Sequence, residues 1–300
     1  MRLFLLMIFV APSAALVAAD SLQDRLAGAL RAQKAGDVVG AAATYRALLL
    51  ANPHLTAARH LLGVCELQSG NMAEGIRQLE MVRREDPADR QAAYTLVSTY
   101  VAIGLLDDAR KIVESTLRTD ASPPSRFMRG SYAMAKGDYA LAISELQQAR
   151  RLDPRLPGVT SQLGIALCFA NSLDRAIPIL EAALVENPND ANAAAFLGWL
   201  YKDRDRNAEA EALLNRTVRA RPDDKGALFL LAQLAQLRGD NQPAIGMLER
   251  VVALDPSHRP AHVLLARLYR QTKRLDDAAR VAGIVERLNA ELQALQPKAR

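Results

Sequence analysis

The chain has 300 residues, of which 50% are hydrophobic and only 5% aromatic, and its net charge is +5. This length suits either one large core or an elongated array, and the abundance of alanine and leucine favours helices. The sequence lacks alternating runs of β-branched and aromatic residues, so the composition argues against a β-rich fold.

The first 19 residues differ in character from the rest of the chain. Arg2 is followed by an uninterrupted apolar run over residues 3–10, and small residues then lead up to Ala19. This order is typical of a secretory signal peptide, and we expect cleavage before Asp20. The alternative is an uncleaved anchor, because residues 3–19 approach the length that spans a bilayer. The alanine- and arginine-rich composition favours a bacterial source, so we expect an exported protein, periplasmic or secreted.

From residue 22 onward the sequence repeats itself. The segments 137–154 and 239–256 both begin with Gly-Asp and end with Leu-Asp-Pro, and they lie 102 residues apart, which is three times 34. Other residues recur with the same spacing of 34, apart from one step of 33. Small residues recur at Ala41, Gly75, Ala109, Ala142, Ala176, Ala210, Ala244 and Ala278. A second series, which marks a turn, comprises Gly36, Gly70, Gly104, Gly137, Asn171, Asp205, Gly239 and Lys273.

One repeating unit, residues 191–222, illustrates the structure that this pattern predicts. Apolar residues at helical spacing predict a first helix over about 191–202, a short polar turn, and a second helix that ends near Ala220. Gly198 and Ala210 lack bulk, so the two helix backbones can approach closely. A single hairpin of this kind cannot bury its apolar stripes, and we therefore expect the units to stack on one another.

The period of 34 and its recurring residues resemble the tetratricopeptide repeat (TPR) family. The leucine–glycine pair of that family is matched by Leu62-Gly63, Leu163-Gly164 and Leu197-Gly198, and its tyrosine by Tyr100, Tyr201 and Tyr269. The resemblance implies an all-α fold, a right-handed superhelical solenoid of about eight helix–turn–helix repeats with a C-terminal capping helix. The array would occupy residues 20–290, with the end of the capping helix and a tail over 291–300. The expected repeats are about 22–55, 56–89, 90–122, 123–156, 157–190, 191–224, 225–258 and 259–290.

The single step of 33 lies in residues 117–127, which contain Pro123 and Pro124. A lost residue changes the packing between neighbouring repeats. This segment therefore predicts either a bend between the first three and the last five repeats or a slightly altered loop in one continuous array.

No pattern in the sequence predicts a catalytic residue, a metal site or a cofactor. His258 and His262 are four residues apart, but Pro260 lies between them and no carboxylate partner is placed to complete a metal site. Cys65 and Cys168 are three repeats apart, too far for a disulfide, and both fall in apolar helical patterns. We expect them to pack in the core. Arginines on the second helices are interleaved with acidic residues and few aromatics, which favours a solvated face over nucleic-acid binding.

In the TPR family the first helices line a concave groove. The resemblance places these residues there: His60, Val64, Tyr94, Ser98, Phe127, Met134, Ile165, Phe169, Trp199, Phe229 and Gln233, with Arg267 and Arg270 at the far end. An apolar and aromatic groove favours an apolar or amphipathic segment of a partner protein. Some aromatics can instead pack between helices, and Phe196 and Leu230 are candidates for this. The carboxylate clamp and the asparagine ladder of specialised family members are absent from these positions.

The sequence thus predicts a non-enzymatic, exported scaffold that binds a peptide or helix of a protein partner, with membrane contact only through the signal segment or an envelope partner. The alternative is a structural subunit or assembly factor of a cell-envelope complex, for secretion, pilus formation or polysaccharide export, that uses its outer faces. An enzyme with an unrecognised site is disfavoured, because nothing at helical spacing brings a nucleophile, a base and an orienting group together.

Overall fold

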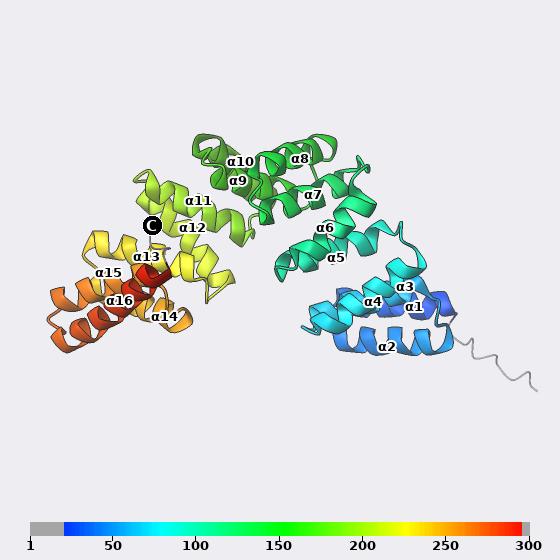
Figure 1. Ribbon diagram of the computed structural model, residues 1–300, viewed down its shortest axis with the longest axis horizontal. Helices are drawn as coiled ribbons and strands as arrows, with labels where there is room; N and C mark the ends of the chain where they lie inside the picture. The colour runs from blue at the N-terminus through cyan, green and yellow to red at the C-terminus, as the bar shows by residue number, and fades with distance from the viewer. Residues whose placement is uncertain (1–20, 296–300) are drawn as a thin grey trace, which may run out of the picture. The chain divides into compact units, whose positions relative to one another are not determined.

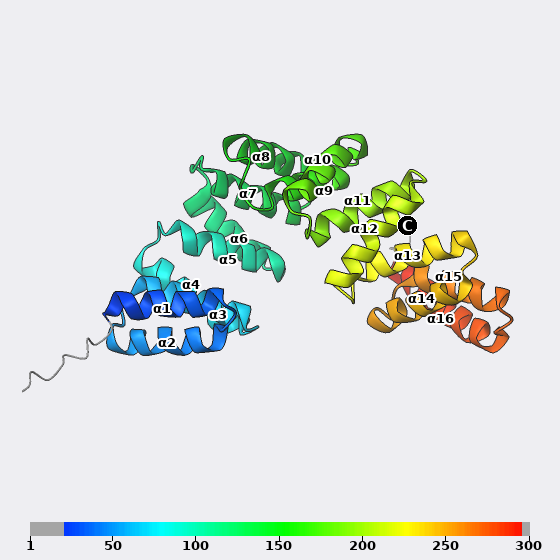
Figure 2. The same cartoon turned by 180° about the vertical axis from the view of Figure 1, so that it is seen from behind.

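The structure is a computed structural model that describes residues 21–295, with side chains described up to residue 290. The expected signal peptide lies outside the described residues. The described residues contain sixteen α-helices, one short π-helix and no strand (Figures 1 and 2). The predicted all-α class and the helical-repeat solenoid are confirmed.

The helices follow one another in eight consecutive pairs, and within each pair the two helices pack side by side. The first three pairs are α1 (Leu22–Lys34) with α2 (Val38–Ala51), α3 (Thr56–Gln68) with α4 (Met72–Glu85), and α5 (Arg90–Ala102) with α6 (Leu106–Ile112) and η1 (Val113–Leu117). The other five are α7 (Pro123–Ala135) with α8 (Tyr139–Leu152), α9 (Val159–Phe169) with α10 (Leu173–Glu186), α11 (Ala191–Asp203) with α12 (Asn207–Ala220), α13 (Lys225–Arg238) with α14 (Asn241–Leu254), and α15 (Arg259–Gln271) with α16 (Leu275–Leu295).

The turn inside every pair contains one residue with a positive φ angle, and these are the eight turn positions that the spacing predicted. Five are glycines, with φ between 78° and 95°, at Gly36, Gly70, Gly104, Gly137 and Gly239. The other three are Asn171, Asp205 and Lys273, with φ of 54°, 58° and 60°. Glycine adopts a positive φ angle without steric cost. At Lys273 the same backbone conformation is unfavourable, because the residue has a Cβ atom. The repeat therefore specifies its turn through backbone conformation.

The two helices of a pair approach closely at the small residues. A Cβ atom added at Gly164 would lie 2.6 Å from Cδ2 of Leu180, and one added at Gly198 would lie 2.9 Å from Cγ of Leu214. Both leucines are completely buried. The prediction that glycine lets the paired helices pack together is confirmed.

The core follows the stack of helices, and both cysteines lie in it. Cys65 packs with Leu48 and Leu62 in the first repeats, and Cys168 packs in the cluster that spans α7 to α13. Both thiols are free and buried, as the sequence predicted. Burial raises the pKa of the Cys168 thiol to about 11, so the thiol stays protonated and unreactive at neutral pH.

The chain divides into two compact units, one ending at Thr119 and the other beginning at Asp120. The division falls in the segment where the repeat spacing shortens by one residue. Immediately before it, the second helix of the third pair changes from α-helix to the π-helical turn η1. The first unit thus holds three helix pairs and the second holds five.

Candidate partner-binding groove

The thirteen residues predicted to line the groove are divided between the two units, and the first unit holds His60, Val64, Tyr94 and Ser98. His60 on α3 and Tyr94 on α5 belong to the first unit, and both are partly buried. Burial lowers the pKa of His60, which favours the neutral imidazole. Nine of the thirteen residues belong to the second unit.

Three of these residues pack against the core and are only partly exposed. Phe127, Met134 and Ile165 are partly buried and pack against the buried cluster of the second unit. Phe196 and Leu230 pack against the same cluster, as the alternative interpretation of the sequence allowed. These five side chains are therefore held by core packing and are only partly exposed.

An aromatic cluster lies at the end of α9. Phe169 is 51% exposed, and its ring stacks on Tyr139 with centroids 5.4 Å apart and an interplanar angle of 16°. Phe169 also meets Phe196 edge-on at 5.7 Å. Tyr139 begins a second helix, α8, so the reasoning from first-helix positions missed it. The sequence feature that could have indicated Tyr139 is its position directly after the turn residues Gly137 and Asp138.

Trp199 borders a small hollow of about 280 Å³ between α11 and α13. The apolar wall comes from Trp199, Phe196 and Leu230. The indole is 37% exposed. Arg221 and Asp224 provide the polar edge and form an ion pair with each other at 2.9 Å. This hollow is therefore apolar in the middle and electrically balanced at its edge.

A larger hollow of about 500 Å³ follows along the same helices, between α13 and α15. Phe229, Gln233 and Arg267 line it, three of the residues that the sequence placed in the groove. The Phe229 ring also packs against the His258 ring, with centroids 5.0 Å apart. Arg270 is exposed on α15 and lines neither hollow. The structure thus brings four of the predicted residues, Trp199, Phe229, Gln233 and Arg267, into two adjoining hollows.

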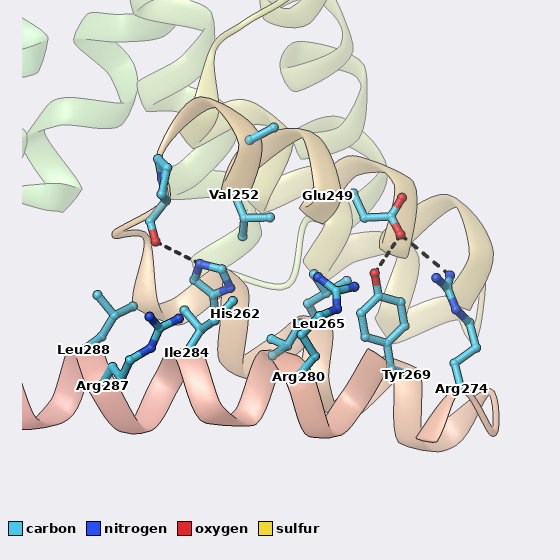
Figure 3. Close-up of a pocket in the computed structure, with 13 residues that line it drawn as sticks. Glu249, Val252, His262, Leu265, Tyr269, Arg274, Arg280, Ile284, Arg287 and Leu288 are labelled. Carbon is cyan, nitrogen blue, oxygen red and sulfur yellow. Dashed lines mark hydrogen bonds and ion pairs between the residues drawn. The ribbon is translucent and has the colours of Figure 1, made fainter. Parts of the chain in front are cut away.

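A further hollow, of about 570 Å³, lies elsewhere, between α14, α15 and α16, and is larger than the two described above (Figure 3). The Tyr269 hydroxyl donates a hydrogen bond to Oε1 of Glu249 at 2.7 Å, and Arg274 lies 3.6 Å from the same oxygen. Ile284 and Leu288 of α16 supply an apolar wall. Sequence reasoning from the first helices did not predict this hollow.

The histidines of α15 have structural roles. The Nδ1 atom of His258 accepts a hydrogen bond from the backbone N–H of Ala261 at 3.1 Å and so caps the helix. Nε2 of His262 lies 3.0 Å from the carbonyl oxygen of Pro256. Among the described residues, no group of three His, Cys, Asp or Glu side chains is arranged to hold a metal ion.

None of the helices in the described part of the chain combines the length and the apolar character that crossing a membrane requires.

Comparisons with known proteins agree with this architecture. One family model of the tetratricopeptide repeat matches residues 32–94 and 170–234. A second model of the same repeat matches residues 94–157 and 127–191. A model described as anaphase-promoting complex, cyclosome, subunit 3 matches residues 203–283. A comparison with curated proteins gave no match.

Several solved structures resemble the chain at 15–20% identity, a level that shows the fold alone. The Cut9–Hcn1 heterotetramer of the APC/C matches with 20% identity and a TM-score of 0.72, over 82% of this chain and 49% of that chain. A tetratricopeptide repeat protein from Parabacteroides merdae matches with 15% identity and a TM-score of 0.60, over 82% and 98%. The pilF protein of Pseudomonas aeruginosa matches with 20% identity and a TM-score of 0.60, over 71% and 97%. From its repeats and its matching family models, the chain belongs to the tetratricopeptide repeat family.

Proposed function

We propose that the chain is an exported, non-enzymatic scaffold that binds a peptide or helical segment of a partner protein along α11, α13 and α15. Membership of the TPR family supports the coarser role, a helical-repeat scaffold for protein–protein contacts. The finer role rests on one observation: two adjoining hollows on these first helices display exposed apolar side chains. Trp199, Leu237 and Val263 are 37%, 69% and 44% exposed.

Exposed apolar surface of this kind favours binding because covering it removes it from water. Each Å² of buried apolar area contributes about 25 cal/mol before the costs of association. Tryptophan is enriched among the residues that dominate binding energy, since its large ring fills a pocket with little loss of conformational freedom. Trp199 is the only tryptophan of the chain. It is therefore our candidate for the central anchor of the bound segment.

Replacement of Trp199 by alanine tests this assignment. The partner would be recovered by affinity purification from the envelope fraction and quantified by mass spectrometry. We expect Trp199→Ala to reduce its recovery, and Val185→Ala, at an 83% exposed position of the second helix α10, to leave it unchanged. Equal recovery with both variants, at equal thermal stability, would remove the groove from the proposal.

Export is the second part of the proposal and rests on residues 1–19 alone. Mass spectrometry of the protein from a periplasmic fraction should find a mature chain that begins at Asp20. A full-length chain in the membrane fraction would instead favour the uncleaved anchor. A full-length chain in the cytoplasm would contradict export.

The alternative function is a structural subunit or assembly factor of a cell-envelope complex. The observation that favours it is the hollow between α14, α15 and α16, which is larger than either first-helix hollow. Arg280 and Arg287 line it and are exposed on α16. Charge reversal at these two arginines should disrupt the assembly if this face is the contact, and should leave it intact if the first helices are.

A further inference from the structure

The hollow between α13 and α15 has a basic edge. Lys202 reaches it from the end of α11, and Arg259 and Arg267 reach it from α15. Arg259 is the first residue of α15, so the positive end of the helix dipole adds to its charge. No acidic residue is among those that line the hollow.

Several other arginines of the second unit are compensated by carboxylates, whereas these three cations have no carboxylate partner among the described residues. Arg206 pairs with Glu209, Arg274 pairs with Asp277, and Arg238 pairs with Glu211 and Asp240. Among the residues that the structure describes, no carboxylate lies within ion-pair distance of Lys202, Arg259 or Arg267. The positive potential of the hollow is therefore available to a ligand.

The floor between the cations is apolar. It contains Phe229 and Leu264, together with the exposed side chains of Leu237 and Val263. Gln233 and Gln236 add amide groups that can donate and accept hydrogen bonds. A small inorganic anion would satisfy the cations and leave this apolar surface in water. A purely apolar segment would cover the floor and leave the cations without counter-charges.

We propose that the occupant of this hollow is an acidic, amphipathic segment of a partner protein. Its large apolar side chains cover Phe229, Leu237 and Val263, and its Asp or Glu carboxylates face Arg259 and Arg267. The inference rests on the proposed function, since it names the chemistry of the segment that the first helices bind. Charge complementarity of this kind raises the association rate and rejects basic segments.

A displayed library of random peptides, selected on the full-length protein, tests the inference even while the partner is unidentified. We expect the enriched peptides to carry net negative charge together with large apolar residues. For a synthetic enriched peptide, Arg259→Gln and Arg267→Gln should each weaken binding about threefold, because partly exposed charge pairs contribute modestly. The matched control is Arg219→Gln, at an exposed position of the second helix α12, and it should change nothing. Binding should also weaken at higher ionic strength.

The apolar floor has its own variants. Leu237→Ser and Val263→Ser should weaken binding of the same peptide, whereas Val185→Ser on α10 should not. Enrichment of neutral or basic peptides that still lose binding on Val263→Ser would overturn the acidic occupant and leave groove binding in place. Absence of enrichment, or enriched peptides indifferent to every first-helix substitution, would overturn both proposals. A dimer in sedimentation that Arg259→Gln and Arg267→Gln dissociate would identify the occupant as a second copy of this chain and overturn the inference.

Discussion

The hydroxyl group of Tyr201 donates a hydrogen bond to Oε1 of Glu181, 2.6 Å away on the second helix of the preceding repeat. The same bond recurs twice at the same separation of 20 residues. Tyr100 bonds to Glu80 at 2.8 Å, and Tyr269 bonds to Glu249 at 2.7 Å. The corresponding positions between the first two repeats, Arg46 and Glu66, form an ion pair instead. We call these contacts the inter-repeat latch.

An arginine strengthens the latch in two of these repeats. The guanidinium carbon of Arg206 lies 3.6 Å from the centroid of the Tyr201 ring, and Arg206 also lies 3.9 Å from Glu181. Arg274 lies in the same way against Tyr269 and Glu249, at 4.3 Å and 3.6 Å. Each of these arginines contacts the tyrosine ring and the carboxylate of the preceding repeat, so that neighbouring repeats are joined by polar contacts as well as by apolar packing.

Removal of the Tyr201 hydroxyl should reduce stability. Tyr201→Phe leaves the ring in place and removes the donor to a charged acceptor, so we expect a loss of about 1–3 kcal/mol in the free energy of unfolding. Urea unfolding followed by circular dichroism measures it. Tyr139→Phe provides the control, because it removes the hydroxyl of a partly buried tyrosine outside these contacts and keeps its ring. The double variant Tyr201→Phe/Glu181→Gln measures the coupling of the two groups. If its loss of free energy of unfolding equals the sum of the losses in the two single variants, the groups are not coupled, and the proposed contribution of the latch is contradicted.

The latch should also make stability depend on alkaline pH. Burial, followed by the hydrogen bond to Glu181, raises the pKa of Tyr201 from its ordinary value of 10 to about 12. The folded state therefore binds this proton more tightly than the unfolded chain does. The stabilisation is complete below pH 10 and is lost as the pH rises from 10 through 12. Urea unfolding across this interval should show a falling free energy of unfolding.

The Tyr201→Phe variant identifies the origin of that decline. Its free energy of unfolding should fall less steeply between pH 10 and 12 than that of the unaltered protein, because one titrating group is gone. Tyr269, whose pKa burial also raises to about 12, should behave in the same way. Parallel curves for all three proteins would show that neither tyrosine carries the pH dependence.

Glycines in the helices should respond to alanine according to the space around them. At Gly164 the new Cβ would lie 2.6 Å from Leu180, so the helices must move apart, and we expect a loss of about 1–3 kcal/mol. At Gly246, with nothing within 4 Å, alanine should stabilise α14 by about 0.5–1 kcal/mol. Thermal and urea unfolding of both variants measure the difference. A gain in stability at Gly164 would contradict the close approach of α9 and α10.

Lys273 offers a stabilising substitution in the last repeat. Its φ of 60° is unfavourable for a residue with a side chain, so Lys273→Gly should raise the free energy of unfolding by about 1 kcal/mol. The reverse change, Gly239→Lys, introduces the same conformational penalty at φ 84° and should lower stability by a similar amount. Changes of the same sign in the two variants would show that the turn conformation does not decide the effect.

The fold could be predicted from the sequence because its determinants are local and recur. The turn residues predicted the positive φ angles, and the small residues predicted the close helix contacts, since each depends on one position within one repeat. The latch could not be predicted in this way. It joins Tyr201 to Glu181 of the neighbouring repeat. Only some repeats have a glutamate at the position that Glu181 occupies in its second helix. The π-helical turn at residues 113–117 was also not predicted, although the shortened spacing indicated an altered packing there.

The candidate site was less predictable than the fold. Helical position placed Trp199, Phe229 and Arg267 on first helices, and they line the two hollows there. Helical position alone could not distinguish these residues from Phe127 and Ile165, which occupy equivalent positions in their repeats but pack against the core. The difference arises because burial depends on the size of neighbouring side chains. The basic edge of the larger first-helix hollow joins cations of two helices, α11 and α15, so it depends on how these helices are placed in the fold. Lack of ion-pair partners is likewise a property of the folded chain.

Photo-crosslinking in intact cells tests the central claim, that the first helices of the second unit bind the partner. A photoreactive residue would replace Trp199 in one protein and Arg219, exposed on the second helix α12, in another. Mass spectrometry would then locate the crosslinked peptide within the captured protein. We predict capture at position 199 only, at one contiguous segment rich in acidic and large apolar residues. Capture at position 219 and none at position 199 would contradict groove binding and favour a subunit that assembles through its outer face.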